Sequence, residues 1–163
     1  ESKLSVQEIE AYFSVKQDIG VAITYQYLAQ REHDLDLIID NKGMTAVEKL
    51  ESFVLYVLNH TFHHTDCQPR LGDLITTMVA QRPEVISLHR QTKLRLLRRL
   101  LTLGQQSGEF EFNDIDDSAL AIYSAITVFC IPLIMTMYTL SELEQKAILL
   151  CDLTLNGLAT RTS

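Results

Sequence analysis

The sequence predicts an all-α protein, and three observations support this. Apolar residues recur at intervals of three and four, which places them on one helical face. A hydroxyl residue followed three positions later by Glu or Gln, a pattern that caps helix N-termini, occurs at several points. No segment shows the alternation of a half-buried strand, and the presence of only six Gly and three Pro favours long helices with short connections.

The N-terminal stretch LSVQEIEAYFSVKQDI predicts a short helix, a tight turn and the start of a second helix. Ser5 with Glu8, and Ser14 with Gln17, have the spacing of a capping box, in which the hydroxyl accepts a backbone N–H and the longer side chain reaches back. The second helix is expected to continue to a stop at Gly43.

Three further helices are predicted in the middle of the chain. Thr45 with Glu48 opens the first, and the stretch HTDCQP ends it. A shorter helix is expected over residues 70–81. Pro83 then opens a long helix, because proline suits the first turn, and Gly108 ends that helix.

The segment from Ser118 to Ser141 carries no charged residue and is predicted to form an apolar helix. Its length would suffice to cross a bilayer, but acidic residues flank it on both sides and no Lys or Arg stands close. We therefore expect a helix buried in a soluble protein. The acids of the preceding loop, GEFEFNDIDD, suit the dipole at its N-terminus, and Ser141 with Glu144 is expected to open a last helix that ends near Gly157.

Composition limits the class of protein. A chain of 163 residues with 47% hydrophobic and 21% charged residues fits one globular domain, with at most a small appendage. The net charge of −7 makes the whole chain a poor partner for nucleic acid, so a DNA-binding role requires a local patch or residues beyond this sequence. Three cysteines and no signal-peptide pattern favour a reducing compartment, and we expect a cytoplasmic protein.

The N-terminal stretch resembles the end of the helix-turn-helix of TetR-family transcriptional regulators and the start of their next helix. The positions that carry this match are Ser5, Ile9, Tyr12, Phe13, Lys16 and Ile19. A second segment, LGQQSGEFEFNDIDDSALA, is similar to the family's glycine, aspartate-rich turn and Ala-rich helix, and it matches at Gly108, Phe110, Ile115, Asp116 and Ala121. The closing LTLNGL resembles the end of the family's last helix.

The resemblance implies a TetR-like helical bundle in two parts. Residues 1–18 would be the remnant of the DNA-binding domain, and residues 19–163 the ligand-binding and dimerisation domain. The helices that normally precede the recognition helix would need about 25 to 40 residues, so we expect them to lie outside this sequence.

The resemblance also implies a DNA-binding surface formed by Ser5, Gln7, Tyr12 and Lys16. An N-terminal cap at Ser5 leaves backbone N–H groups for phosphate, Gln7 suits adenine, and Lys16 can hold a phosphate. Glu8 and Glu10 depart from the family pattern, and their carboxylates would repel phosphate. The alternative, taken from the residues alone, is a surface helix whose apolar side chains pack inward.

A ligand pocket is expected among the middle helices, as in the family. The predicted lining is Phe53, Tyr56, Val57, His60, Met78, His89, Tyr123 and Thr127. His60, His89, Tyr123 and Thr127 are its polar members. The alternative is that these Met and aromatic residues are ordinary core, which is the commoner role for such residues at helical spacing.

Two polar clusters have competing interpretations. In HTFHHTDC, His60 with His63 or His64 has the spacing of two metal ligands on a helix, but closed sites need three or four, so a polar helix end without metal is favoured. The stretch HRQTKLRLLRR is the most basic in the chain, and we expect a solvated face that pairs with acids of neighbouring helices rather than a nucleic-acid patch. Its cations are Arg90, Lys93, Arg95, Arg98 and Arg99.

The last two helices are predicted to form a four-helix interface across a two-fold axis, as in TetR-like dimers. The expected interface residues are Ile122, Ile126, Phe129, Leu133, Leu143, Ala147, Leu150 and Thr154. No catalytic arrangement, cofactor site or metal site is predicted. The functional hypothesis is a homodimeric repressor that binds a palindromic operator and is released by a small-molecule effector. The alternative is a dimeric helical ligand-binding or interaction module that no longer reads DNA.

Overall fold

The computed structural model describes the backbone of residues 6–67 and 69–158, and within these ranges it describes the side chains of residues 18–63, 70–78, 80–85 and 87–157. The fold class is all-α, as predicted, and no strand occurs among the described residues. In order, the larger helices are α1 (Val6–Asp40), α2 (Ala46–Cys67), α3 (Pro69–Gln81), α4 (Pro83–Gln106), α5 (Ile115–Ile126) and α7 (Leu140–Leu158).

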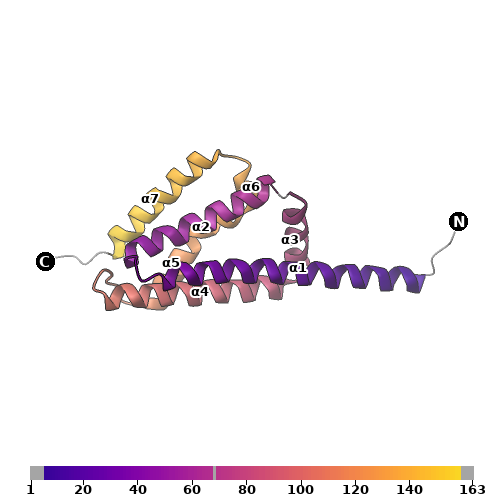
Figure 1. The fold of residues 1–163 in the computed structure, drawn as a ribbon, viewed down its shortest axis with the longest axis horizontal. Coiled ribbons are helices and arrows are strands. Elements are labelled where there is room, and N and C mark those ends of the chain that lie inside the picture. The colour runs from indigo at the N-terminus through magenta and orange to yellow at the C-terminus, as the bar shows by residue number, and fades with distance from the viewer. Residues whose placement is uncertain (1–5, 68, 159–163) are drawn as a thin grey trace.

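Helix α1 is one continuous helix of 35 residues, so the tight turn expected before Lys16 is not formed. The segment between Val6 and Ile19 contains neither Gly nor Pro, and a Ser inside a helix does not interrupt it when its neighbours favour the helix. The N-terminal part of α1 extends well beyond the other helices (Figure 1). The part that packs on them buries an apolar stripe, Leu28, Leu35 and Ile39.

The predicted starts and stops of the middle helices are confirmed. Thr45 Oγ1 accepts a hydrogen bond from Glu48 N at 3.1 Å, and Glu48 Oε2 accepts one from Thr45 N at 2.8 Å, which is the expected capping box before α2. Helix α4 begins at Pro83 and ends just before Gly108, whose φ of +77° lies in the left-handed region that glycine adopts easily.

The uncharged segment is not a single helix. It is divided into α5, a short 3-10 helix η1 (Thr127–Cys130), a single turn α6 (Pro132–Met135) and the start of α7. Pro132 forces this break, because it has no N–H to continue the ladder and drives Ile131 to an extended conformation, with φ −99° and ψ 108°. The described residues include no helix that is both long and apolar enough to cross a membrane.

The helix caps around this segment differ from the expectation at one end only. Asp114 caps α5, because its carboxylate accepts from the N–H groups of Asp116 and Asp117, as the acid-rich loop predicted. The box before α7 is formed by Thr139 and Glu142 rather than by Ser141 and Glu144, so α7 begins two residues earlier than predicted. Glu142 Oε2 accepts from Thr139 N at 2.8 Å.

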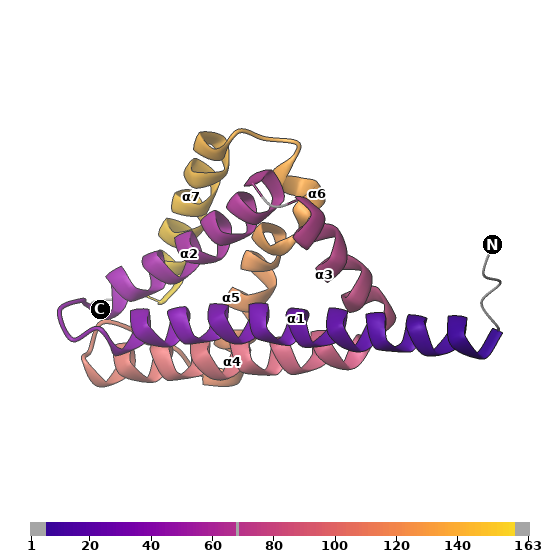
Figure 2. The same cartoon turned by 45° about the vertical axis from the view of Figure 1, so that its right-hand side comes forward.

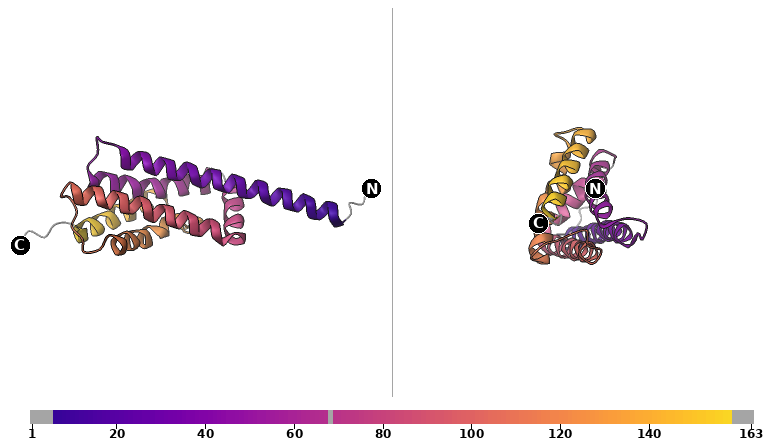
Figure 3. Two further views of the ribbon diagram at one scale, coloured as in Figure 1. Left: turned by 90° about the horizontal axis from the view of Figure 1, so that it is seen from below. Right: turned by 90° about the vertical axis from the view of Figure 1, so that its left-hand side faces the viewer.

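The helices outline a triangle in projection, with α1 and α4 side by side along one edge, α2 and α7 along the second and α3 along the third (Figure 2). Helix α5 lies within this outline and packs on α4. Helices α1 and α4 run in the same direction, and α1 continues past the end of the bundle marked by α3 (Figure 3, left).

The basic run on α4 pairs with acids of neighbouring helices, as predicted. Arg99 Nη1 lies 2.7 Å from Asp36 Oδ1 of α1 and also pairs with Asp40. Arg98 pairs with Asp116 of α5. These ion pairs lie on the outer face of α4. Lys93 belongs to the same basic run, but its side chain is buried.

Candidate ligand-binding site

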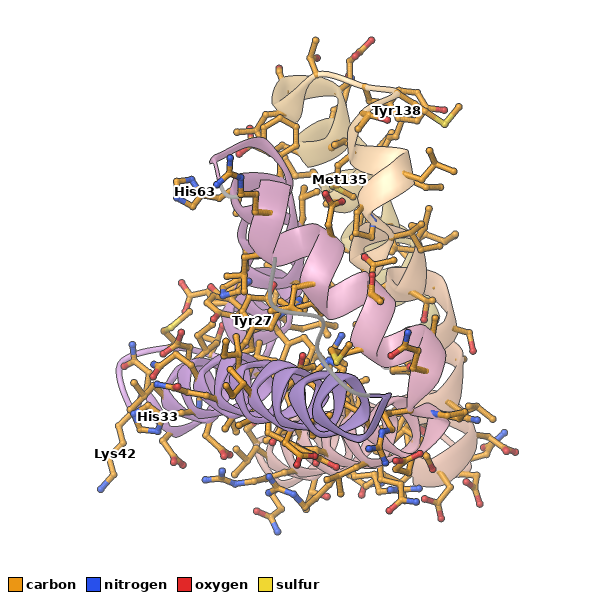
Figure 4. The ribbon with its side chains drawn as sticks, turned by 90° about the vertical axis from the view of Figure 1, so that its right-hand side faces the viewer. Tyr27, His33, Lys42, His63, Met135 and Tyr138 are labelled. Atoms are coloured by element: carbon orange, nitrogen blue, oxygen red, sulfur yellow. The ribbon has the colours of Figure 1, made fainter. Side chains whose placement is uncertain are left out.

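A cavity of about 340 Å³ lies where α1, α3, α4 and the segment from α5 to α6 come together. Thr61 of α2 closes one side of it. The cavity is lined by Tyr27, Leu28, Arg31, Thr61, Gly72, Ile75, Thr76, Val85, His89, Lys93, Tyr123, Thr127, Cys130, Ile131 and Pro132. Figure 4 shows Tyr27 directed into the space between α1 and α2, whereas His33 and Lys42 project outward. A mostly apolar cavity of this size, with a few polar groups, is typical of a small-molecule site.

Three of the eight predicted pocket residues line this cavity, namely His89, Tyr123 and Thr127. Phe53 and Val57 do not, because both are fully buried in the core between the helices. The helical spacing of Phe53 and Val57 fitted either a pocket wall or an ordinary core. The structure places both residues in the core.

The other three predicted residues lie behind the cavity wall. His60 Nδ1 is 3.3 Å from the Tyr27 hydroxyl, and its ring is tilted against the ring of Tyr56. The Tyr56 hydroxyl donates to Asp34 Oδ2 at 2.6 Å. Met78 packs against α1 at Gly20, where an added Cβ would lie 2.9 Å from Met78 Sδ. These contacts support the wall without contributing to its surface.

Two cationic residues in the wall were not predicted. Arg31 of α1 is 6% exposed and Lys93 of α4 is 2% exposed. The sequence contained a signal for each. Arg31 continues the buried stripe Thr24, Leu28, Leu35 and Ile39, and Lys93 stands one turn before Leu97 on the buried face of α4. A charged residue within such a stripe is buried only where something nearby accommodates it.

The environment of the cavity disfavours protonation of its basic groups. Burial lowers the pKa of His89 to about 4, against the opposing effect of its contact with Glu32, and the nearby charges of Lys93 and Arg31 add to the lowering. His89 Nδ1 lies 3.3 Å from Glu32 Oε1. Burial also lowers the pKa of Lys93, and the Arg31 charge contributes to the shift. Burial raises the pKa of Tyr27.

The predicted DNA-binding residues lie at the N-terminal end of α1. Ser5 lies outside the described residues. Gln7, Tyr12 and Lys16 are on α1, but their side chains lie outside the described part of the chain. Their proposed contacts with DNA therefore stay a prediction.

The predicted dimer residues divide between the core and the surface. Ile122, Ile126, Phe129, Leu143 and Ala147 are buried within the single chain, so their faces point inward rather than toward a partner. The prediction placed Ile122, Ile126 and Phe129 outward because it expected an uninterrupted apolar helix with one face on its own bundle and the other free. Leu150 and Thr154 are half-buried, and only Leu133 is well exposed. Among the described side chains of α5, η1 and α7, the exposed large apolar residues are Leu120, Val128, Ile148, Leu149 and Leu153.

The histidine-rich end of α2 shows no metal site in its described part. Where side chains are described, no three His, Cys, Asp or Glu residues come together in a way that could hold a metal ion. The side chains of His64 and Cys67 lie outside that part. His60 instead contacts Tyr27 and Tyr56.

Comparison with known proteins agrees with this architecture. Residues 46–151 match the family model described as "Tetracyclin repressor-like, C-terminal domain". The fold is similar to the crystal structure of a bacterial regulatory protein in the TetR family from Rhodococcus RHA1, with a TM-score of 0.60 and 18% sequence identity, over 97% of this chain and 82% of that chain. No curated protein matches the sequence.

The family match spans more than half of the chain and includes α2, α3, α4 and most of the segment that closes the cavity. It is a family of transcriptional regulators rather than of enzymes. The chain belongs to the tetracycline-repressor-like (TetR) family, of which it carries the C-terminal domain.

Proposed function

We propose that this chain is the effector-binding and dimerisation part of a DNA-binding transcriptional repressor that acts in the cytoplasm. A small molecule binds in the cavity, two copies of the chain associate, and the dimer binds a palindromic operator. The proposal draws its function class from the family, and its site from the cavity that α1 shares with α3 and α4.

The main support for the proposal is that one continuous helix, α1, both lines the cavity and extends beyond the other helices (Figure 1). This helix contributes Tyr27, Leu28 and Arg31 to the cavity and continues without a break to Val6. Because a continuous helix moves largely as a rigid rod, a ligand that displaces α1 at the cavity also displaces its far end. In a dimer the two far ends would move relative to each other, which changes how well two DNA-reading units fit consecutive turns of the duplex.

We expect α1 to tilt about the point where it contacts α3. Gly20 allows Met78 of α3 to approach closely, and Ile75 of α3 lies in the cavity wall one turn earlier. A ligand beside Ile75 therefore acts on the two helices that meet at Gly20. For the ligand to release DNA, it must bind more tightly to the arrangement with low DNA affinity.

The outer faces of α5 and α7 support dimerisation. Leu149 and Leu153 of α7 are 60% and 72% exposed, and Leu120 of α5 is 41% exposed. Leu149 and Leu153 lie one turn apart on α7, and a large exposed apolar patch on a protein surface marks an interaction site. A second copy that presents the same faces across a two-fold axis would form the four-helix interface expected from the sequence.

Fluorescence anisotropy tests the DNA-binding part of the proposal. The complete gene product would be titrated into labelled DNA from upstream of its own gene and into scrambled DNA, at low and at physiological salt. We expect preferential binding to the upstream DNA, with an affinity that falls as salt rises. Equal binding to both DNAs by a folded dimer would favour the alternative, a ligand-binding module that no longer reads DNA.

A further inference from the structure

The two buried cations of the cavity have no carboxylate partner in the described part of the chain. The Arg31 guanidinium lies over the ring of Tyr27, 5.7 Å from its centroid. Arg31 Nη2 donates to Thr61 Oγ1 at 3.3 Å, and Arg31 Nε is buried without a hydrogen-bond partner. Lys93 Nζ contacts Cys130 Sγ at 3.1 Å, which is a weak acceptor for one of its three donors. Among the described residues, no carboxylate forms an ion pair with either side chain.

The acids closest in sequence to Arg31 are engaged elsewhere. Glu32 contacts His89, on the side of α1 that faces α4. Asp34 accepts the Tyr56 hydroxyl at 2.6 Å and the Gln30 amide at 2.9 Å. Asp36 pairs with Arg99 at 2.7 Å. The cavity therefore holds two cations that form no ion pair with any described residue, and Glu32, whose contact His89 is uncharged near pH 7, offsets only part of their charge from a distance.

An unpaired buried cation is expensive, because it loses its hydration without gaining an opposite charge. Arg31 and Lys93 also repel each other, since the charge of Arg31 contributes to the lowered pKa of Lys93. An anion between them would supply the missing acceptor for Arg31 Nε and a strong acceptor for Lys93 Nζ. The remaining wall is mostly apolar, with Leu28, Ile75 and Val85 among its residues.

We propose that the cavity binds an organic carboxylate with an apolar body, and that its acid group is held between Arg31 and Lys93. The hydrocarbon part packs against Leu28, Ile75 and Val85. The volume of about 340 Å³ accommodates a ligand of at least about ten non-hydrogen atoms, since a water molecule occupies roughly 30 Å³. This inference rests on the proposed function only in taking the cavity as the effector site.

The test compares an acid with its neutral isostere. Octanoate and octanamide, and 3-phenylpropanoate with its amide, would be titrated calorimetrically into the full chain without DNA. We expect each acid to bind at least about tenfold more tightly than its amide, as charge-assisted hydrogen bonds predict. Octanoate should also slow the alkylation of Cys130 by iodoacetamide, because this thiol lies in the cavity wall.

Variants identify the residues responsible. Arg31→Met and Lys93→Met each replace the cation by an unbranched, uncharged side chain, and each should abolish most of the preference for the acid. Both variants should remain folded, and thermal melting without ligand should show unchanged or raised stability, since each removes an uncompensated buried charge. Arg99→Met is the matched control. Arg99 is on α4, like Lys93, but it pairs with Asp36 and Asp40 outside the cavity.

Three results would overturn the inference: equal binding of acid and amide, an acid preference that survives both cavity variants, or no binding of either acid to the folded protein. Loss of the preference in Arg99→Met would overturn it as well, since a general charge effect would then explain the binding. Failure of the DNA titration leaves these outcomes unaffected, so the two proposals can fail separately.

Discussion

The carboxylate of Glu109 caps the N-terminus of α2 from a loop 63 residues further along the chain. Its Oε1 accepts a hydrogen bond from Ala46 N at 3.1 Å, and its Oε2 accepts one from Val47 N at 3.2 Å. Ser107 Oγ donates to the same carboxylate at 2.7 Å. The first N–H groups of a helix have no partner within the helix, so this contact satisfies two of them and joins α2 to the end of α4.

Replacing this carboxylate should weaken the fold in a pH-dependent manner. Partial burial alone would raise the pKa of Glu109, but hydrogen bonds from Ala46, Ser107 and Val47 outweigh it and lower the pKa below its ordinary value. A lowered folded-state pKa means that the stabilisation is present above the unfolded-state value and is lost as the pH falls through the folded-state value. We expect Glu109→Gln to lower the free energy of unfolding at pH 7 by about 1 kcal/mol.

Urea unfolding of both proteins at pH 7 and at pH 3 measures this effect. The difference between them should shrink at low pH, as the pH falls through the lowered folded-state pKa of the Glu109 carboxyl. Glu111→Gln is the control, because Glu111 is exposed in the same loop. An undiminished difference at low pH would show that the side chain acts through packing rather than through charge.

Gly104 allows the loop after α4 to fold back onto the helix. Glu109 N and Phe110 N donate to its carbonyl oxygen at 2.9 and 3.1 Å. An added Cβ would lie 2.7 Å from Phe110 Cγ and closer still to the ring edge, and Phe110 is 3% exposed. Gly104→Ala should therefore destabilise the protein by about 1–3 kcal/mol, although alanine favours the helix by about 1 kcal/mol.

Gly157→Ala provides the matched comparison for this substitution. Gly157 is also in a helix, but an added Cβ there meets nothing within 4 Å. Thermal melting should show a lower Tm for Gly104→Ala and an unchanged or higher Tm for Gly157→Ala. Equal Tm values for the two variants would mean that the Phe110 ring moves aside without cost.

Local signals in the sequence predicted most helix boundaries. The capping box of Thr45 and Glu48, and the stop at Gly108, depend only on residues within one turn, so they can be recognised without the fold. Three boundaries failed. The start of α7 is capped by Thr139 and Glu142 rather than by Ser141 and Glu144, and the other two failed for an equally local reason. The pattern of Ser14 with Gln17 occurs inside α1, because such a pair caps a helix only where a helix starts, and Pro132 ended a helix that its apolar neighbours suggested would continue.

The cavity was harder to predict than the fold. Its wall is drawn from α1, α3, α4 and α5, and the spacing of residues along one helix does not indicate which turn faces a void rather than a neighbour. His89, Tyr123 and Thr127 were found because they are polar residues on otherwise apolar faces. Lys93 was assigned to the solvated face because it belongs to a run of cations, and only its register with Leu97 distinguishes it from Arg95 and Arg99.

His89 should make the protein less stable in mild acid. Its folded-state pKa of about 4 lies below the ordinary value, chiefly through burial, with Lys93 and Arg31 adding to the shift and Glu32 opposing it. Between about pH 6.5 and 4 the unfolded chain binds a proton that the folded chain does not, so the free energy of unfolding falls as the pH decreases. At about 1.4 kcal/mol per pKa unit, we expect a loss of roughly 2–3 kcal/mol.

Urea unfolding at pH 7, 6 and 5 would measure this loss in a range where Glu109 remains ionised. His89→Gln removes the titrating group and should flatten the dependence. His33→Gln should leave it unchanged, since His33 projects from the exposed side of α1 (Figure 4). A steep dependence that persists in His89→Gln would assign the titration to another group.

The outer face of α7 should control association of the chain. Leu149 and Leu153 are well exposed, whereas Leu143 is 1% exposed in the core beneath them. If the chain dimerises as proposed, we expect the double substitution Leu149→Glu with Leu153→Glu to yield a monomer, because like charges would meet across the proposed two-fold axis in place of apolar contacts. Its circular dichroism should match that of the parent protein, since neither side chain contributes to the core.

Leu143→Ala should have the opposite effects. Removing a buried leucine leaves a cavity and costs about 2–5 kcal/mol of stability, but it leaves the outer face of α7 unchanged. Sedimentation equilibrium at several protein concentrations, together with thermal melting, separates the two variants. If the double glutamate variant remains a dimer, the interface lies elsewhere, and the exposed leucines of α7 then need a different partner.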